Sequence, residues 1–142
     1  MTILQQVLRD KGHDVFSVGP DNTVLDAIQL MADKNVGSLV VLNEGILVGI
    51  VTERHYARNV FLKGRSSPKT KVGDIMSTRV VYVTPDHTVD EAMALMTEKA
   101  VRHLPVMEGE ELVGIISIGD LVKSTISSQR FVIEQLERYI TR

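Results

Sequence analysis

The chain of 142 residues contains two copies of one repeated segment. Pro20 and Pro85 occupy equivalent positions, at an offset of 65 residues, and the match extends without gaps on both sides. Two pairs of segments carry most of it: "VGPDNTVLDAIQLMADKNV" (18–36) with "VTPDHTVDEAMALMTEKAV" (83–101), and "LVGIVTERHY" (47–56) with "LVGIISIGDL" (112–121). Between 15–57 and 80–122, 17 of the 43 aligned pairs are identical. A tandem duplication of this kind predicts two copies of one supersecondary unit.

Each copy predicts a first helix with a defined start. Thr23 precedes Asp26 by three residues, and Thr88 precedes Glu91, which is the spacing of a capping box. An apolar stripe at helical spacing follows in each copy: Val24, Ala27, Ile28 and Met31, then Val89, Ala92, Met93 and Met96. We expect the methionines to fill the core and not to hold a ligand.

The strands follow from short apolar runs. A β-branched run before the helix predicts a first strand, at 15–18 in one copy and at 80–83 in the other. Two more runs follow the helix with a polar turn between them, at 39–42 with 47–51 and at 104–107 with 112–116, and they predict hairpins. A last helix completes a β-α-β-β-α unit.

The flanks predict helices and a linker. The segment 2–11 has an apolar face, and so does 127–142, so each predicts an amphipathic helix that packs on its own core or in a dimer interface. "GRSSPKT" has the composition of a surface linker, and "VGDIM" predicts a short turn or helix that starts the second unit. The expected organisation is an N-terminal helix (1–14), repeat 1 (15–64), a linker (65–78), repeat 2 (79–125) and a C-terminal helix (126–142).

Composition argues against several classes of protein. The net charge of −2, 4% aromatic residues and the lack of tryptophan disfavour a nucleic-acid binder. There is no long apolar run that could span a bilayer, and the first residues have no signal-peptide pattern. The absence of cysteine excludes disulfides and thiolate metal sites and fits a reducing compartment, so we expect a cytoplasmic protein.

Catalytic motifs are not found in the sequence. The four histidines lack metal-ligand spacing, and no nucleophile elbow, Walker loop or dinucleotide fingerprint occurs. We therefore expect neither an enzyme nor a metal site.

A binding site is better supported, at the strand-to-helix turn that ends each repeat. The start of a helix offers free N–H groups and a positive dipole end to an anion. Ser117 adds a hydroxyl there, and Asp120 has the acceptors for a vicinal diol such as ribose; Thr52 and His55 are the equivalents in the first repeat. The alternative is that Ser117 and Asp120 only cap the helix, since Ser-x-x-Asp is also capping spacing.

These motifs resemble those of the CBS (cystathionine β-synthase) domain pair, or Bateman module. "GIISIGDLV" resembles the closing motif Gly-h-h-(Thr/Ser)-x-x-Asp in full, where h is an apolar residue. "VRHLPV" is similar to the second strand, and "VGDIM" to the lead-in before a second motif. The resemblance covers about 15–125 and implies a stand-alone regulatory sensor of adenosine-containing ligands: AMP, ADP, ATP, NAD(H) or S-adenosylmethionine. It implies such a ligand as a regulator and no catalytic cofactor.

The resemblance further implies two clefts, each combining strand residues of one repeat with the closing motif of the other. One cleft would use Ser17, Val18, Asn22, Val36, Gly37 and Ser38 with Ile115, Ser117, Ile118 and Asp120. The other would use Tyr82, Val83, His87, Val101, Arg102 and His103 with Ile50, Thr52, Glu53, Arg54 and His55. Asp120 would hold the ribose, and Arg54, Arg58, Arg102 and His103 would form a phosphate-binding group.

His55 departs from the family pattern, because it stands where the ribose-binding aspartate belongs. A neutral imidazole has one acceptor, so it cannot accept both hydroxyl protons of a diol. Three outcomes are open: a weakened or empty cleft, a changed ligand, or a protonatable site that prefers phosphate at lower pH. We favour a weaker or differently specific cleft.

The sequence as a whole predicts an α/β fold of two β-α-β-β-α repeats, tandem CBS domains paired about a pseudo-two-fold axis. We expect a homodimer that binds an adenine nucleotide and signals to an unidentified protein, with no nucleic-acid or membrane partner. The alternative is a structural dimerisation module with vestigial clefts. A nucleotide-acting enzyme is the least favoured of the three functions.

Overall fold

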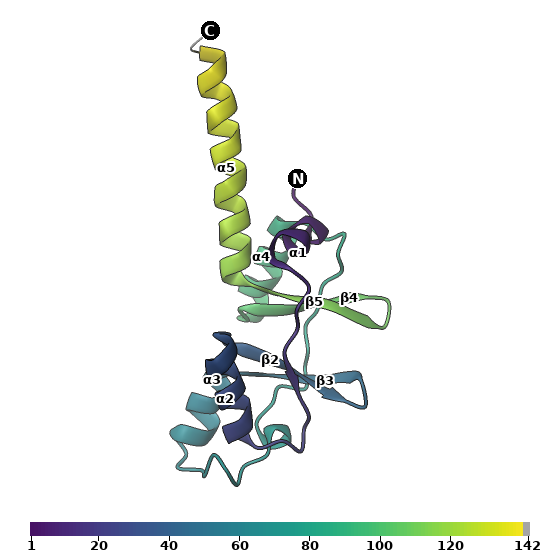
Figure 1. The fold of residues 1–142 in the computed structure, drawn as a ribbon, viewed down its shortest axis with the longest axis vertical. Helices are drawn as coiled ribbons and strands as arrows, with labels where there is room; N and C mark the ends of the chain where they lie inside the picture. Colours follow the sequence, from purple (N-terminus) through teal and green to yellow (C-terminus); the bar gives the residue numbers. More distant parts are fainter. Residues whose placement is uncertain (141–142) are drawn as a thin grey trace. The chain divides into compact units, whose positions relative to one another are not determined.

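A computed structural model describes residues 1–140 of the chain, excluding the side chain of residue 140. The fold is mixed α/β, and the chain divides into two compact units (Figure 1). One unit contains residues 15–80. The other contains residues 1–14 together with the chain from Val81 onward. Each repeat therefore has its own core, and each unit is described separately below.

The unit of residues 15–80 has the predicted β-α-β-β-α order. Its elements are β1 (Ser17–Val18), α2 (Val24–Lys34), β2 (Ser38–Asn43), β3 (Ile46–Thr52), α3 (Glu53–Tyr56), a π-helical turn η1 (Ala57–Phe61) and a 3₁₀ turn η2 (Val72–Asp74). β2 is the central strand, parallel to β1 and antiparallel to β3. The predicted hairpin is confirmed.

The other unit follows this order except for the first strand, and its sheet has two strands. Its elements are α1 (Leu4–Lys11), α4 (Val89–Lys99), β4 (His103–Glu108), β5 (Glu111–Ser117) and α5 (Ile118–Ile140). β4 and β5 form the predicted antiparallel hairpin.

The first strand predicted at 80–83 is wrong, because only Val83 pairs with the sheet, through a single parallel bridge to Val106. The reason lies in the neighbouring strand. In the first repeat the Val40 N–H donates to the Phe16 carbonyl at 3.3 Å. Pro105 occupies the position equivalent to Val40, and proline has no N–H to donate. The second repeat therefore cannot extend this ladder beyond Val83.

The helix starts follow the predicted capping pattern. The Thr88 hydroxyl accepts from the Glu91 N–H at 3.0 Å, and the Glu91 carboxylate accepts from the Thr88 N–H at 3.0 Å. Thr23 accepts from the Asp26 N–H at 3.1 Å, but no return bond from the shorter Asp26 side chain is present in the described structure. Of the methionines predicted to be core residues, Met31 and Met96 are 2% and 3% exposed, and Met93 is partly buried against the core.

The segment that precedes each repeat packs on the other repeat. Leu4 of α1 is completely buried in the core of the second repeat, where its N–H donates to the His87 carbonyl at 2.9 Å. Val72 of η2 is equally buried in the core of the first repeat, and its N–H donates to the Asn22 carbonyl at 2.8 Å. The short turn or helix predicted at "VGDIM" is confirmed, but the segment packs with the first repeat. Its apolar side chains complete the first repeat.

Two equivalent glycines make room for these exchanged segments. A Cβ on Gly114 would lie 2.6 Å from a Leu8 methyl carbon, and a Cβ on Gly49 would lie 2.7 Å from the Met76 sulfur and 2.8 Å from the Ser77 carbonyl oxygen. All three separations are shorter than the contacts that real Cβ atoms make, so a larger residue would displace the segment from its strand. The glycine of each closing motif thus serves packing.

The last helix is longer than predicted. α5 runs without a break from Ile118 to Ile140, so the closing helix of repeat 2 and the expected C-terminal helix are one element. Residues 141–142 of the latter lie outside the described part. Figure 1 shows α5 continuing well past α1 and α4, which pack against its first turns. Beyond residue 125 every side chain described on α5 is exposed.

Candidate functional site

The closing turn of the second repeat is held by reciprocal hydrogen bonds. The Ser117 N–H donates to Asp120 Oδ2 at 2.8 Å, and the Asp120 N–H donates to Ser117 Oγ at 3.2 Å. This is a capping box at the start of α5, so the capping role weighed from the sequence is real. Capping occupies Oδ2 only. Within the described residues no hydrogen bond reaches Oδ1, which leaves an acceptor for a ligand.

His55 makes the same pair of bonds in the first repeat. The Thr52 N–H donates to His55 Nδ1 at 3.1 Å, and the His55 N–H donates to Thr52 Oγ1 at 3.2 Å. Because Nδ1 accepts, the ring proton must lie on Nε2. The imidazole thus replaces the carboxylate as a cap and turns a donor, not an acceptor, outward.

The charge state of His55 follows from its surroundings. Burial lowers the pKa of His55, and the nearby Arg54 and Arg58 lower it further. The group is therefore neutral at pH 7, as its acceptor role requires. Of the three outcomes left open by the sequence, the protonatable site that prefers phosphate would require a pH below the ordinary pKa of histidine.

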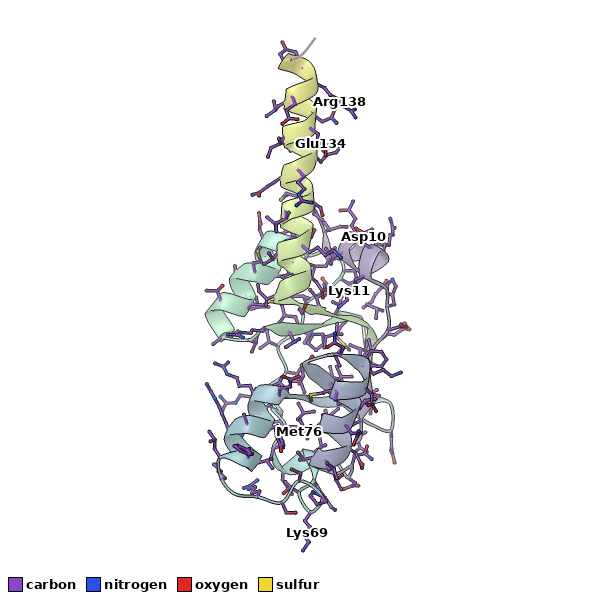
Figure 2. The ribbon with its side chains drawn as sticks, turned by 60° about the vertical axis from the view of Figure 1, so that its left-hand side comes forward. Asp10, Lys11, Lys69, Met76, Glu134 and Arg138 are labelled. Carbon is purple, nitrogen blue, oxygen red and sulfur yellow. The ribbon has the colours of Figure 1, made fainter. Side chains whose placement is uncertain are left out.

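Asp120 also binds Lys11, which the sequence did not suggest. Lys11 Nζ lies 2.6 Å from Asp120 Oδ2 and 2.8 Å from the Ile115 carbonyl oxygen. Figure 2 shows Lys11 beside the first turns of α5. A lone lysine at the end of an amphipathic helix belongs to no motif, and 109 positions separate it from Asp120, so no pattern could reveal this pair.

These contacts set the protonation of the site. Burial raises the pKa of Asp120, but the hydrogen bonds from Lys11 and from the Ser117 N–H outweigh burial and hold that pKa below its ordinary value. Burial also lowers the pKa of His103, which Asp120 raises and Lys11 and Arg102 lower. Near neutral pH the turn thus carries a carboxylate beside a neutral imidazole.

The predicted site residues fall in both units. The unit of residues 15–80 contains Ser17, Val18, Asn22, Val36, Gly37, Ser38, Ile50, Thr52, Glu53, Arg54, His55 and Arg58. The other contains Tyr82, Val83, His87, Val101, Arg102, His103, Ile115, Ser117, Ile118 and Asp120. Combination of the two sets into shared clefts remains a prediction.

Within each unit the second strand meets the closing turn. His103 lies opposite Ser117 in the β4–β5 register, and the Ile118 N–H donates to the Arg102 carbonyl at 2.9 Å. The equivalent contacts join Ser38 to Thr52 and Gly37 to Glu53. The polar residues predicted at the ends of these elements therefore share one edge of each hairpin.

Two other predicted ligand residues hold a turn. Asn22 Oδ1 accepts from the Gly19 N–H at 2.6 Å, and His87 Nδ1 accepts from the Thr84 N–H at 2.9 Å. His87 thus replaces an oxygen acceptor as His55 does. Val83 is 3% exposed and belongs to the core, whereas Tyr82 is 57% exposed.

A metal site and a membrane-spanning helix are both absent from the described residues. No group of three or more histidine or carboxylate side chains among them is placed to hold a metal ion. No helix in the described part is long and apolar enough to cross a bilayer.

Comparison with known proteins identifies the repeats. The family model for the CBS domain matches residues 8–61 and again 72–126. A structure of a protein with CBS domains from Burkholderia ambifaria is 50% identical, with a TM-score of 0.87 over 90% of this chain and 96% of that one. The mitochondrial CBS domain-containing protein CBSX3 of Arabidopsis thaliana is 40% identical over 98% of this chain and 72% of its own length.

A more distant structure shares the fold. The CBS domain pair of protein MJ0100, in complex with 5′-methylthioadenosine and S-adenosylmethionine, is 20% identical, with a TM-score of 0.79 over 90% of this chain and 98% of that one. The duplicated unit, the closing turn that ends each copy and these similarities all point to the same family. The chain belongs to the CBS domain family and contains the domain twice.

Proposed function

We propose that the chain is a regulatory module that binds an adenine nucleotide and passes the binding event to a partner protein. The observation that carries this proposal is the closing turn of the second repeat. There a hydroxyl, the start of a 23-residue helix and a carboxylate with one unused oxygen lie together. A diol and an anion are the groups such a turn recognises. The MJ0100 pair, of the same fold, holds adenosine-containing ligands.

Cationic groups stand beside both turns and support recognition of phosphate. Arg54 and Arg58 are exposed and close enough to His55 to lower its pKa. Arg102 is exposed at the edge where His103 meets Ser117. A guanidinium binds phosphate through two parallel N–H donors, so each turn has an arginine within its own unit that is suited to bind phosphate.

The two turns are proposed to differ in affinity. Asp120 keeps an oxygen free to accept a hydroxyl proton, whereas neutral His55 presents only a donor. Loss of a hydrogen bond to a charged group typically weakens binding by about ten- to a hundredfold. The turn containing Asp120 is therefore the tighter site, and the turn containing His55 is weaker or takes a different ligand.

Calorimetric titration with AMP, ATP, NADH and S-adenosylmethionine tests the proposal. We expect at least one of these ligands to bind with a dissociation constant well below about 1 mM, in two events of unequal affinity. Absence of binding by all four at millimolar concentration would reject the sensor function. Product analysis of the same mixtures would reveal turnover and so distinguish an enzyme.

A second candidate function, dimerisation, is favoured by one observation on α5. Val122, Ile126, Ile133 and Leu136 are all at least 43% exposed, and Gln129 lies between them. The five positions are spaced alternately four and three residues apart. That is the spacing of a coiled-coil seam, which a second copy of the same helix would complement. We propose that two chains associate through this seam, whether or not the turns bind a ligand.

Replacement of Ile133 by glutamate is expected to separate this dimer, because it places a charge in the apolar seam. Light scattering should give twice the chain mass for the wild type and the single-chain mass for Ile133→Glu. Gln135→Glu adds the same charge outside the seam and should leave the mass unchanged. A wild-type protein that is monomeric at high micromolar concentration would reject the seam.

A further inference from the structure

Lys11 is fixed on the proposed ligand carboxylate by the core of its own unit. It is the last residue of α1, whose inner face is anchored by Leu4, Val7 and Leu8, each at most 5% exposed. The ammonium reaches Asp120 Oδ2 and the Ile115 carbonyl oxygen. The side chains of the pair are only 30% and 23% exposed, so both charges are partly removed from water.

This ion pair imposes a condition on any ligand that uses Asp120. A diol held by both carboxylate oxygens needs Oδ2, which already accepts bonds from Lys11 and from the Ser117 N–H. If the ligand displaces the ammonium, a partly buried cation loses its counter-ion, which is costly. A ligand that carries its own anion can replace that counter-ion, whereas a neutral or cationic ligand cannot.

The surroundings of the pair offer space for such an anion. Lys11 and Asp120 line a groove of about 570 Å³ between α1 and α5. The other charged groups that line it are Asp10 and Lys123, so two cations and two carboxylates face it in total. A diol bound to Asp120 Oδ2 would take the place of the Lys11 ammonium there, and the ammonium would then need another anion within the groove.

We propose that Lys11 makes this site selective for phosphate-bearing adenosine ligands over neutral or cationic ones. The inference rests on the proposed function and narrows its ligand class. AMP, ADP, ATP and NAD(H) each bring an anion to the freed ammonium. Adenosine brings none, and S-adenosylmethionine brings no phosphate and carries a sulfonium and an ammonium beside its single carboxylate.

Titration of wild type and Lys11→Met with AMP and with adenosine tests this selectivity. The wild type should bind AMP at least tenfold more tightly than adenosine. In Lys11→Met, Asp120 Oδ2 loses the ammonium and keeps only the bond from the Ser117 N–H, and the anion of the ligand loses its partner, so this preference should shrink by about tenfold or more. Thermal unfolding of the same samples verifies that the variants are folded.

Two further variants separate the contact from general charge effects. Lys99→Met removes the same charge from α4 of the same unit, where it does not touch Asp120, and should keep the preference. Lys11→Arg keeps the cation and should retain most of it. Wild-type binding of AMP with a preference that Lys11→Met leaves unchanged would overturn the inference while the proposed function stands. Failure of the wild type to bind any adenosine ligand would overturn both.

Discussion

Replacement of Leu4 by alanine is expected to lower the free energy of unfolding by about 2–5 kcal/mol, the range for a large side chain deleted from a core. Leu4 is 0% exposed and packs among the buried side chains of the second repeat, although the chain places it ahead of the first. The N-terminal helix thus supplies part of a core that would otherwise be open on one side. Chemical denaturation followed by circular dichroism measures the loss.

Leu25→Ala is the matched control for this prediction. Leu25 lies on α2 and is 44% exposed, so the same chemical change should cost well under the loss at Leu4. Hydrogen exchange adds a spatial test, because the loss of protection should be largest in β4, β5 and α4. Equal effects of the two variants would show that α1 is not part of this core.

The parts of the fold that depend on residues close together in the sequence could be predicted from it. The duplication sets the architecture, and the spacing of apolar residues predicts α2, α4 and both hairpins. The helix starts are also local, because Thr88 and Glu91 meet across a single turn. Such features need only the chain's own short-range geometry.

The features that were missed depend on partners distant in sequence. The loss of the strand at 80–83 is caused by Pro105, which matters only once the two segments are paired. The exchange of lead-in segments also has no short-range signature, since Val72 and Leu4 look like ordinary apolar residues beside the nearest repeat. The same holds for Lys11 and Asp120, which only the packed core of the unit brings together.

The structure gives His55 a role that the sequence did not indicate. From the sequence it is a residue that lacks the acceptors of an aspartate. In the structure its Nδ1 preserves the cap on α3, and the cost of the substitution falls on the outward-facing atom alone. His87 does the same at the Thr84 turn, where its Nδ1 accepts the N–H bond that the Asn22 oxygen accepts in the first repeat. Histidine therefore keeps the fold in both places while it alters the chemistry offered to a ligand.

Replacement of Asp120 by alanine is expected to weaken the tighter of the two binding events strongly, because it removes the carboxylate at the proposed ribose position. The expected loss is about ten- to a hundredfold in affinity. The same change removes a helix cap, so a matched control is needed. Glu91→Ala deletes the equivalent capping bond on α4 and should leave both binding events unchanged.

The reverse change at the other turn completes the test. His55→Asp should keep the cap, since a carboxylate oxygen can accept from the Thr52 N–H as Nδ1 does. It also adds an acceptor for a hydroxyl beside Arg54 and Arg58, which favour the ionised form. The weaker event should therefore strengthen by about tenfold or more, measured with the same nucleotide. Asp120→Ala removes a carboxylate from one closing turn, and His55→Asp adds a carboxylate to the other. If both variants left the affinities unchanged, neither closing turn would be a ligand site.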